Sequence, residues 1–377
     1  MELQKFLREN SNWEEILSEE PYCLKWKEDG DYILFSYNQL SSDFSIPLVR
    51  EARGIIFTKD NFDVVCRPYC KFGNYGESYA ATIDWTSARI SQKIDGSLIK
   101  MWFHNEAWHI STNNTIDASN AKVEDFFFHN YKELFLEAVR KNTFINTFYS
   151  MLDKNYTYMF ELVSPSTRVV IPYSKINAFY LSRINNKTGE EIWGADDKNS
   201  CGLAVPKMYT MNTLEEVVAA AELLPWDEEG YVVFDKNFNR VKIKSPQYVI
   251  AHYARNNGAL TSKRLIKVVL DNEVGEFLTY CEDYKDYINL IYVLMQSSNI
   301  SASAILQEVR ANCNNFSRKE YAIYCKDYPK WLFSFLMNNY ENNITWNEYT
   351  KDWSETKWDN LFESKYGKNY LGIALKS

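Results

Sequence analysis

The sequence predicts an α+β domain over residues 1–246 followed by an all-helical domain over residues 247–377. A length of 377 residues suits two domains better than one. Up to residue 246, short apolar runs with strand-like alternation are separated by polar turns. Beyond it, apolar residues recur every three or four positions, which is the period of an amphipathic helix.

The first elements alternate between helix and strand patterns. Apolar positions at Leu3, Phe6 and Leu7 predict a helix within the first 20 residues. The stretch 23–38 then reads as strand, Asp-Gly turn and strand, and 53–72 repeats this form around a polar turn. Residues 88–112 add two or three short strands, so this half of the domain should form antiparallel sheets.

The second half of the α+β domain mixes both patterns again. We expect a helix over 119–141 and strands over 156–163 and 176–184. Thr213 and Glu216 have the spacing of a capping box and open a further helix. Residues 230–245 predict a last hairpin.

The C-terminal part is helical throughout its length. Four segments carry apolar residues at helical spacing: 262–270, 275–296, 301–313 and 317–338. Ser317 and Glu320 form a second capping-box pattern at the start of the last one.

Composition excludes several classes of protein. A formal net charge of −8 argues against a protein that coats nucleic acid non-specifically. The seven cysteines contain no CxxC pair and the four histidines do not cluster, which argues against a zinc site. We expect reduced thiols in a cytoplasmic protein with no signal peptide and no membrane span.

The motif Lys-x-Asp-Gly at residues 93–96 is the first candidate for chemistry. One interpretation is a β-turn carrying a surface lysine. The other is a lysine nucleophile beside a nucleotide pocket, which requires neighbouring cations to favour the neutral amine. The motif alone is weak evidence, because three fixed positions recur by chance in roughly one chain in twenty of this length.

Other charged residues match the second interpretation. Lys242 and Lys244 stand two apart on a predicted strand, so both side chains leave one face, where a triphosphate could lie between them. Lysines that keep an exposed edge strand from pairing with other chains explain this pattern equally well. Glu161 and Glu229 border apolar strands and suit either a hydrated Mg²⁺ and ribose hydroxyls or a structural ion pair.

Two further stretches supply phosphate-binding residue types. Arg53 starts a predicted strand, and Lys71 precedes Phe72, whose ring could stack on a base or pack in the core.

Taken in order, these stretches resemble the covalent nucleotidyltransferases, and within them the bacteriophage RNA ligases of the T-even, tRNA-repair type. The matching stretches cover the first two-thirds of the chain: FSYN (35–38), EARGIIF (51–57), RPYCKFGN (67–74), KIDGS (93–97), FELVSPSTRVVIPY (160–173), EGYVV (229–233) and VKIKSPQYV (241–249). The resemblance implies a ligase-type nucleotidyltransferase domain with flanking helices over 1–246 and a helical RNA-specificity domain over 247–377.

The resemblance also implies roles for single residues. Lys93 becomes the lysine that is adenylylated, and Glu161 and Glu229 support the metal, directly or through water. The residues expected to bind ATP or AMP are Tyr37, Arg53, Lys71, Phe72, Gly96, Glu161, Glu229, Lys242 and Lys244. The chain departs from the family pattern at Asn113, where a lysine is expected, so one phosphate contact is missing or comes from elsewhere.

The function implied is an ATP-dependent RNA ligase that uses Mg²⁺, with Mn²⁺ as an alternative. Its partner would be RNA with 3′-hydroxyl and 5′-phosphate ends, such as a cleaved tRNA, and the protein would act as a monomer. A DNA ligase or capping enzyme is the near alternative, although a β-barrel rather than helices usually follows the last lysine motif there. A non-catalytic RNA-binding relative is more distant, because no nucleophile or carboxylate is lost.

The helical domain carries a basic cluster of its own: Arg255, Lys263, Arg264 and Lys267. It could contact RNA backbone, and a solvated helix face is at least as good an explanation.

Overall fold

A computed structural model describes residues 1–39, 41–197, 201–253 and 261–372. The chain divides into two compact units, Met1–His252 and Tyr253–Ser377. The predicted basic cluster is only partly covered, because Arg255 lies outside the described residues. No helix in the described ranges is long and apolar enough to cross a bilayer. The seven cysteines, all within those ranges, are free thiols.

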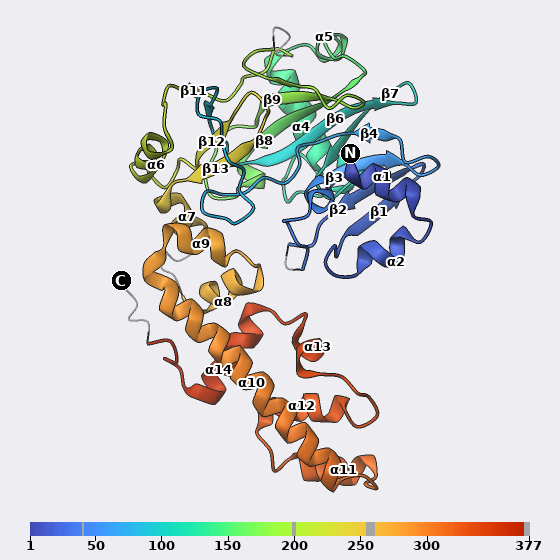
Figure 1. The fold of residues 1–377 in the computed structure, drawn as a ribbon, viewed down its shortest axis with the longest axis vertical. Helices are drawn as coiled ribbons and strands as arrows, with labels where there is room; N and C mark the ends of the chain where they lie inside the picture. The colour runs from blue at the N-terminus through green and yellow to red at the C-terminus, as the bar shows by residue number, and fades with distance from the viewer. Residues whose placement is uncertain (40, 198–200, 254–260, 373–377) are drawn as a thin grey trace. The chain divides into compact units, whose positions relative to one another are not determined.

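The first unit contains three antiparallel sheets, which confirms the predicted fold class (Figure 1). Their strand orders are β1-β2-β3-β4, β10-β9-β8-β6-β7 and β11-β5-β12-β13. The strands are β1 (Lys25–Asp29), β2 (Tyr32–Ser36), β3 (Arg53–Thr58), β4 (Val64–Cys66), β5 (Arg89–Gln92), β6 (Ser97–His104), β7 (Ala107–Thr112), β8 (Tyr156–Val163), β9 (Asn177–Asn185), β10 (Glu191–Trp193), β11 (Met208–Tyr209), β12 (Gly230–Phe234) and β13 (Arg240–Lys244).

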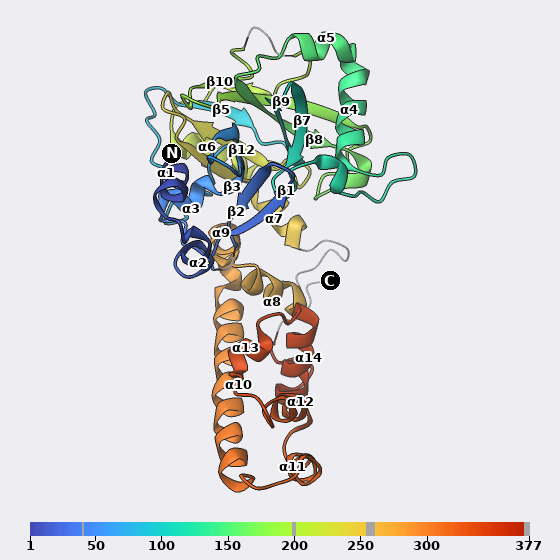
Figure 2. The same ribbon diagram turned by 90° about the vertical axis from the view of Figure 1, so that its right-hand side faces the viewer.

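The helices of this unit cover the sheets. They are α1 (Glu2–Glu9), α2 (Trp13–Ser18), α3 (Pro47–Glu51), η1 (Ala118–Asn120), α4 (Tyr131–Asn142), α5 (Ile145–Ser150), η2 (Pro165–Thr167), α6 (Leu214–Glu222) and α7 (Pro246–Tyr253). Figure 2 shows α4 and α5 beside strands β7, β8 and β9. Phe135 of α4 and Phe148 of α5 pack on Phe160 of β8 in one buried cluster, so these helices close one face of the central sheet.

The first sheet follows the sequence pattern closely. Strands β1 and β2 pair through the predicted turn, where Gly30 has φ +54°, a conformation that glycine adopts without strain. Along β2 the pairing with β3 shifts register between Phe35 and Ser36, which leaves Gly54 (φ +76°) as an extra residue of a β-bulge. Arg53 therefore enters the sheet beside a bulge.

The predicted helix over 119–141 is wrong in its first half. Residues 118–120 form only a 3₁₀ turn, and α4 begins at Tyr131. The side chain of Asn130 accepts a hydrogen bond from the backbone N–H of Glu133, so it caps a new helix start. Asp125 likewise accepts the N–H groups of Phe127 and Phe128, which fixes a turn where the apolar pattern suggested a helix.

The third sheet joins strands that are far apart in sequence. Strand β5 pairs with β12, placing Gln92 opposite Tyr231, and β12 pairs with β13, placing Val232 opposite Lys242. These pairings bring the segments that flank β5 close to the segments that flank β13. Helix α6 packs on this sheet through Val217 and Ala221.

The second unit is helical, as predicted. Its elements are α8 (Ser262–Leu270), α9 (Val274–Tyr280), η3 (Glu282–Tyr284), α10 (Lys285–Asn312), α11 (Arg318–Cys325), α12 (Lys330–Asn338), α13 (Trp346–Thr350) and α14 (Glu355–Tyr366). The capping box at Ser317 and Glu320 is confirmed, and Pro329 separates α11 from α12 within one predicted segment.

Helix α10 joins two segments that the sequence suggested were separate. The intervening serines do not break it, because Ser298 and Ser301 donate their hydroxyls to the carbonyls of Leu294 and Ser297 one turn earlier.

Candidate active site

Lys93 stands on a loop whose backbone is fixed by neighbouring strands. The loop joins β5 to β6, and the backbone N–H of Lys93 donates to the carbonyl of Gly230 at 2.9 Å. The side chain is 20% exposed, and its Nζ lies 2.7 Å from Oε1 of Glu229, which is 5% exposed. Nζ of Lys244 lies 3.8 Å from the same oxygen. Glu229 thus holds two lysines at one carboxylate, one from the β5–β6 loop and one from the end of β13.

Asp95 of the Lys-x-Asp-Gly motif anchors the loop through hydrogen bonds to distant residues. It is 4% exposed, and its Oδ2 accepts the backbone N–H groups of Val170 and Ile171 at 2.9 and 2.7 Å. Its Oδ1 accepts the hydroxyl of Tyr248 at 2.8 Å. The motif needs an acidic residue here because two oxygens must accept three donors, a structural reason that sequence reasoning missed.

Gly96 has a steric reason of its own. A Cβ atom at this position would lie 2.5 Å from the carbonyl oxygen of Leu162 and 3.0 Å from Cγ of Glu161. This close approach is to the backbone of β8, and the contact of Gly96 with a nucleotide stays a prediction. The absence of a side chain lets the loop press against the strand that carries Glu161.

Glu161 is a half-buried residue of β8 that lines the cavity close to Lys93 and Arg53. Burial is the main cause that raises its pKa to about 7 from 4.5, and the nearby Lys93 ammonium opposes the shift. Near neutral pH this carboxyl is therefore shared between its protonated and ionised forms. Oε2 of Glu229 is buried and has no hydrogen-bond partner, so this carboxyl has capacity for a further polar group.

Two cations flank one aromatic ring. Nζ of Lys242 lies 5.0 Å and Cζ of Arg53 lies 5.4 Å from the ring centroid of Phe72. The backbone of Lys242 bonds to Gly73 and Tyr75, which brings the segment after Phe72 alongside β13. Nη1 of Arg53 is buried without a hydrogen-bond partner.

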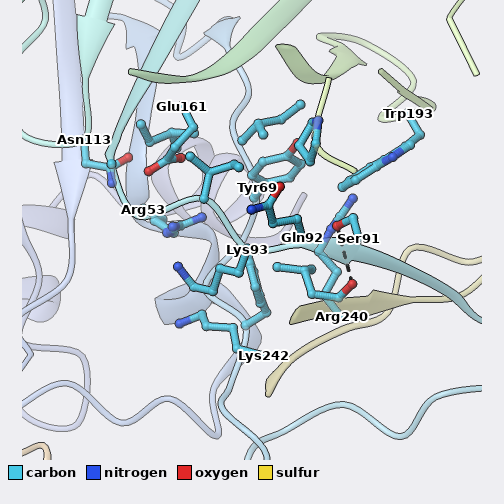
Figure 3. Close-up of a pocket in the computed structure, with 17 residues that line it drawn as sticks. Arg53, Tyr69, Ser91, Gln92, Lys93, Asn113, Glu161, Trp193, Arg240 and Lys242 are labelled. Atoms are coloured by element: carbon cyan, nitrogen blue, oxygen red, sulfur yellow. Dashed lines mark hydrogen bonds between the residues drawn. The ribbon is translucent and has the colours of Figure 1, made fainter. Parts of the chain in front are cut away.

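These side chains surround a cavity of about 240 Å³ (Figure 3). The close-up shows Arg53, Lys93 and Lys242 gathered on one side, with Trp193 and Arg240 opposite. The lining comprises Arg53, Tyr69, Phe72, Ser91, Gln92, Lys93, Ile94, Gly96, Leu98, Asn113, Glu161, Leu181, Trp193, Pro206, Val232, Arg240 and Lys242.

The far end of the cavity was not foreseen from the sequence. The guanidinium of Arg240 stacks 4.5 Å from the ring of Tyr69 and is ion-paired with Glu191. Ser182 joins the same network, donating to Glu191 and bonding the Tyr69 hydroxyl. Nε1 of Trp193 is buried without a hydrogen-bond partner. No motif marks these residues, since they come from three separate parts of the chain: the segment after β4, the β9–β10 pair and β13.

Most of the predicted site residues converge, and two do not. Arg53, Phe72, Lys93, Gly96, Glu161 and Lys242 line the cavity together with Asn113, and Glu229 and Lys244 adjoin it at Lys93. Tyr37 and Lys71 lie outside its lining. Nζ of Lys71 donates to Gln39 and sits 4.8 Å from the ring of Tyr37. Contact of these two with a nucleotide stays a prediction.

The residues suit an anionic ligand better than a bare metal ion. Arg53, Lys93 and Lys242 concentrate positive charge in an acidic protein, and an unpartnered guanidinium nitrogen faces no described acceptor. Within the described ranges, no three His, Cys, Asp or Glu side chains form a group that could hold a metal. A divalent ion would therefore need ligands from water or phosphate in addition to Glu161 or Glu229.

Comparison with known proteins places this geometry in a family. Residues 51–248, just over half of the chain, match the family model described as RNA ligase. A protein of Rhodothermus phage RM378, named RNA ligase, is 26% identical over 385 aligned positions, covering 82% of this chain and 86% of its own. A protein of Thermovibrio ammonificans, also assigned the name RNA ligase, is 29% identical and covers 60% of each chain.

A viral relative is similar over a shorter part of its own length. The protein of Autographa californica nuclear polyhedrosis virus assigned the name bifunctional polynucleotide kinase/RNA ligase is 31% identical over 276 residues. These are 69% of this chain, which spans only 39% of the viral protein. The matched region 51–248 contains Lys93, both carboxylates and the paired lysines. The chain belongs to the RNA ligase family.

Proposed function

We propose that this protein is an ATP-dependent RNA ligase that works through a lysyl-AMP intermediate on Lys93. The observation that supports it most is the placement of Nζ of Lys93 at 2.7 Å from Glu229, on the wall of a cavity that also carries Arg53 and Lys242. A nucleophile, a carboxylate that can take its proton, and cations for phosphate meet at one point.

In the first step, the Lys93 amine forms a bond to the α-phosphorus of ATP while the bond to pyrophosphate breaks. Glu229 is within hydrogen-bond reach of the amine and can hold the proton that leaves it. Lys242, Lys244 and Arg53 would neutralise the departing pyrophosphate. AMP remains on Lys93 through a phosphoramide bond.

In the following steps, a 5′-phosphate oxygen of RNA attacks the same phosphorus and releases Lys93, giving an RNA-adenylate. A 3′-hydroxyl then attacks the 5′-phosphate, forms the phosphodiester and releases AMP. The chain holds the reacting groups in line, which accounts for most of the catalysis expected in such transfers.

A divalent ion, Mg²⁺ or alternatively Mn²⁺, would supply charge neutralisation at the phosphates. Glu161 and Glu229 are the residues that would hold it, through water as well as directly. The unpartnered Oε2 of Glu229 and the raised pKa of Glu161 fit a site that is completed by a cation.

The helical unit is proposed to select the RNA, with a cleaved tRNA as the substrate in an RNA-repair role. We further propose that the protein acts as a monomer in the cytoplasm of a cell or, if it is phage-encoded, of the host. Removal of the helical unit should spare labelling of Lys93 and reduce discrimination between a broken tRNA loop and a linear RNA. Unchanged discrimination would assign selection to the first unit.

The decisive experiment is incubation of the full chain with labelled ATP, GTP or NAD, followed by peptide mapping. We expect label from ATP alone, on the peptide containing Lys93, and none in Lys93→Ala protein that retains its circular dichroism spectrum. Label from GTP would favour a capping enzyme. Absence of any adduct, together with intact RNA binding, would favour the non-catalytic alternative.

A further inference from the structure

Strand β6 carries a lysine that no part of the proposed mechanism uses. Lys100 is fully buried, between the cavity-lining Leu98 and the buried Trp102 on the same face of the strand. Its Nζ donates a hydrogen bond to the backbone carbonyl of Gly54. Few lysines are buried without a reason, because desolvation of an ammonium is costly.

No carboxylate compensates this charge. Among the residues that the structure describes, none forms an ion pair with Lys100. The charged or titratable groups that act on it are the Arg53 guanidinium and the Cys66 thiol. Burial, aided by Arg53, lowers the pKa of Lys100 to about 8 from 10.5, so the ammonium form still prevails at neutral pH. Of these two cations, Arg53 has the Glu161 carboxyl within electrostatic range, whereas no carboxylate of the described residues acts on Lys100.

The ammonium lies directly behind the wall of the cavity. A Cβ atom added to Gly54 would be 2.8 Å from Nζ of Lys100 and 2.6 Å from the backbone oxygen of Asn113. Arg53 and Asn113 both line the cavity. Nη1 of Arg53 and Oδ1 of Asn113 are buried and have no hydrogen-bond partner. The Arg53 nitrogen is a donor that can take a phosphate oxygen, whereas the Asn113 oxygen is an acceptor and adds no contact to an anion.

We propose that Lys100 is a positioning residue of the nucleotide site, which holds the Arg53–Gly54 bulge from behind and brings from β6 the positive charge that Asn113 does not supply. The anion that compensates it is the phosphate chain of a nucleoside triphosphate or of pyrophosphate. This inference rests on the proposed function, since it takes the cavity to bind phosphates. Without ligand, the buried charge of Lys100 lowers the stability of the protein, and phosphate binding compensates for this loss.

The test uses inorganic pyrophosphate as the probe, so that neither RNA nor turnover is involved. Lys100→Met preserves the shape of the side chain and removes the charge, whereas Lys100→Arg keeps a cation. Lys141→Met is the matched control, because Lys141 forms only a surface pair with Glu137 on α4. Calorimetry would give the pyrophosphate affinity, and thermal denaturation would give the melting temperature with and without it.

We expect Lys100→Met to melt at or above the wild-type temperature without ligand and to bind pyrophosphate at least about tenfold more weakly. The Arg variant and the control should stay within about threefold of wild type. Because Asn113 lies at the same point of the wall, adding Asn113→Lys to Lys100→Met should restore most of the affinity. In labelling of Lys93, Lys100→Met should raise the KM for ATP more than it lowers kcat.

Three results would overturn the inference. They are a Lys100→Met protein that fails to fold, one that melts at a lower temperature yet binds pyrophosphate normally, and an equal loss of affinity in Lys100→Arg. Any of these would make Lys100 a purely structural residue while leaving ATP labelling of Lys93 in the wild type untouched. Conversely, the wild-type protein could fail to become labelled by ATP while its pyrophosphate affinity still depends on Lys100. That result would reject the ligase proposal and keep this inference.

Discussion

Replacement of Asp95 by Asn should destabilise the first unit and displace the Lys93 loop. The carboxylate accepts two backbone N–H groups on Oδ2, from Val170 and Ile171, and the Tyr248 hydroxyl on Oδ1, all within 2.9 Å. Hydrogen bonds to a charged acceptor contribute about 1.5–3 kcal/mol each, against about 0.5–1.5 kcal/mol for neutral partners. An amide oxygen can still face the two N–H groups, so the expected loss is about 2–3 kcal/mol in the free energy of unfolding.

Urea denaturation of the full chain, followed by circular dichroism, measures this loss. Tyr248→Phe removes only one of the three donors and should cost about 1–2 kcal/mol. The double variant should lose less than the sum of the two, because both changes act on the same carboxylate. Asp271→Asn is the control: it breaks an exposed pair with Lys267 and should change stability by less than about 0.5 kcal/mol.

The outcome separates an anchoring role from a chemical one. If Asp95→Asn keeps wild-type stability but no longer labels Lys93 with AMP, then Asp95 acts on the reaction directly and the argument from its three donors fails. If stability and labelling fall together, and Tyr248→Phe shows a smaller fall in both, the anchoring role holds.

The remaining predictions concern the carboxyl of Glu161, the close contact of Gly96 with β8, and Lys242. Because the folded pKa of Glu161 is raised to about 7 from 4.5, the native state binds more protons between these values, so unfolding free energy should fall by up to about 3 kcal/mol as pH rises through this window. Glu161→Gln should flatten that part of a pH series of urea titrations, and an unchanged slope would place the ionisation elsewhere. Gly96→Ala should lower the free energy of unfolding by about 1–3 kcal/mol because the new methyl meets the Leu162 carbonyl. Gly275→Ala, which has open space inside α9, should be neutral or stabilising by up to about 1 kcal/mol. Equal effects of the two changes on thermal melting would refute the contact argument. Lys242→Ala should slow labelling of Lys93 by ATP more than sealing of chemically pre-adenylylated RNA, and equal losses would remove its assigned contact with pyrophosphate.

The sequence predicted the parts of the site that depend on local spacing. Lys93 and Gly96 stand in one motif, and Lys242 and Lys244 share a strand face, so their placement follows from the periods of strands and turns. The fold class followed from the same periods. The first half of the helix predicted over 119–141 is wrong because the side chains of Asp125 and Asn130 bind backbone groups, which outweighs an apolar pattern.

The residues that were missed owe their roles to distant parts of the chain. Asp95 depends on donors from residues 170, 171 and 248, and Trp193 and Arg240 meet only because β10, β12 and β13 pack together. In the sequence alone, Lys100 resembles an ordinary polar residue of an alternating strand. Its role becomes apparent only from the β-bulge at Gly54 beside it. A single sequence does not contain these pairings, since each is set by tertiary packing.

The walls of the cavity are drawn from all three sheets, and this has a consequence for synthesis on the ribosome. Arg53 comes from β3, Glu161 from β8 and Lys242 from β13. A nascent chain that has already exposed Lys93 therefore has no competent pocket until β13 has left the exit tunnel. Under the proposed function, self-modification would be postponed until translation of the first unit is essentially finished, and C-terminally truncated chains ending before β13 should carry no AMP.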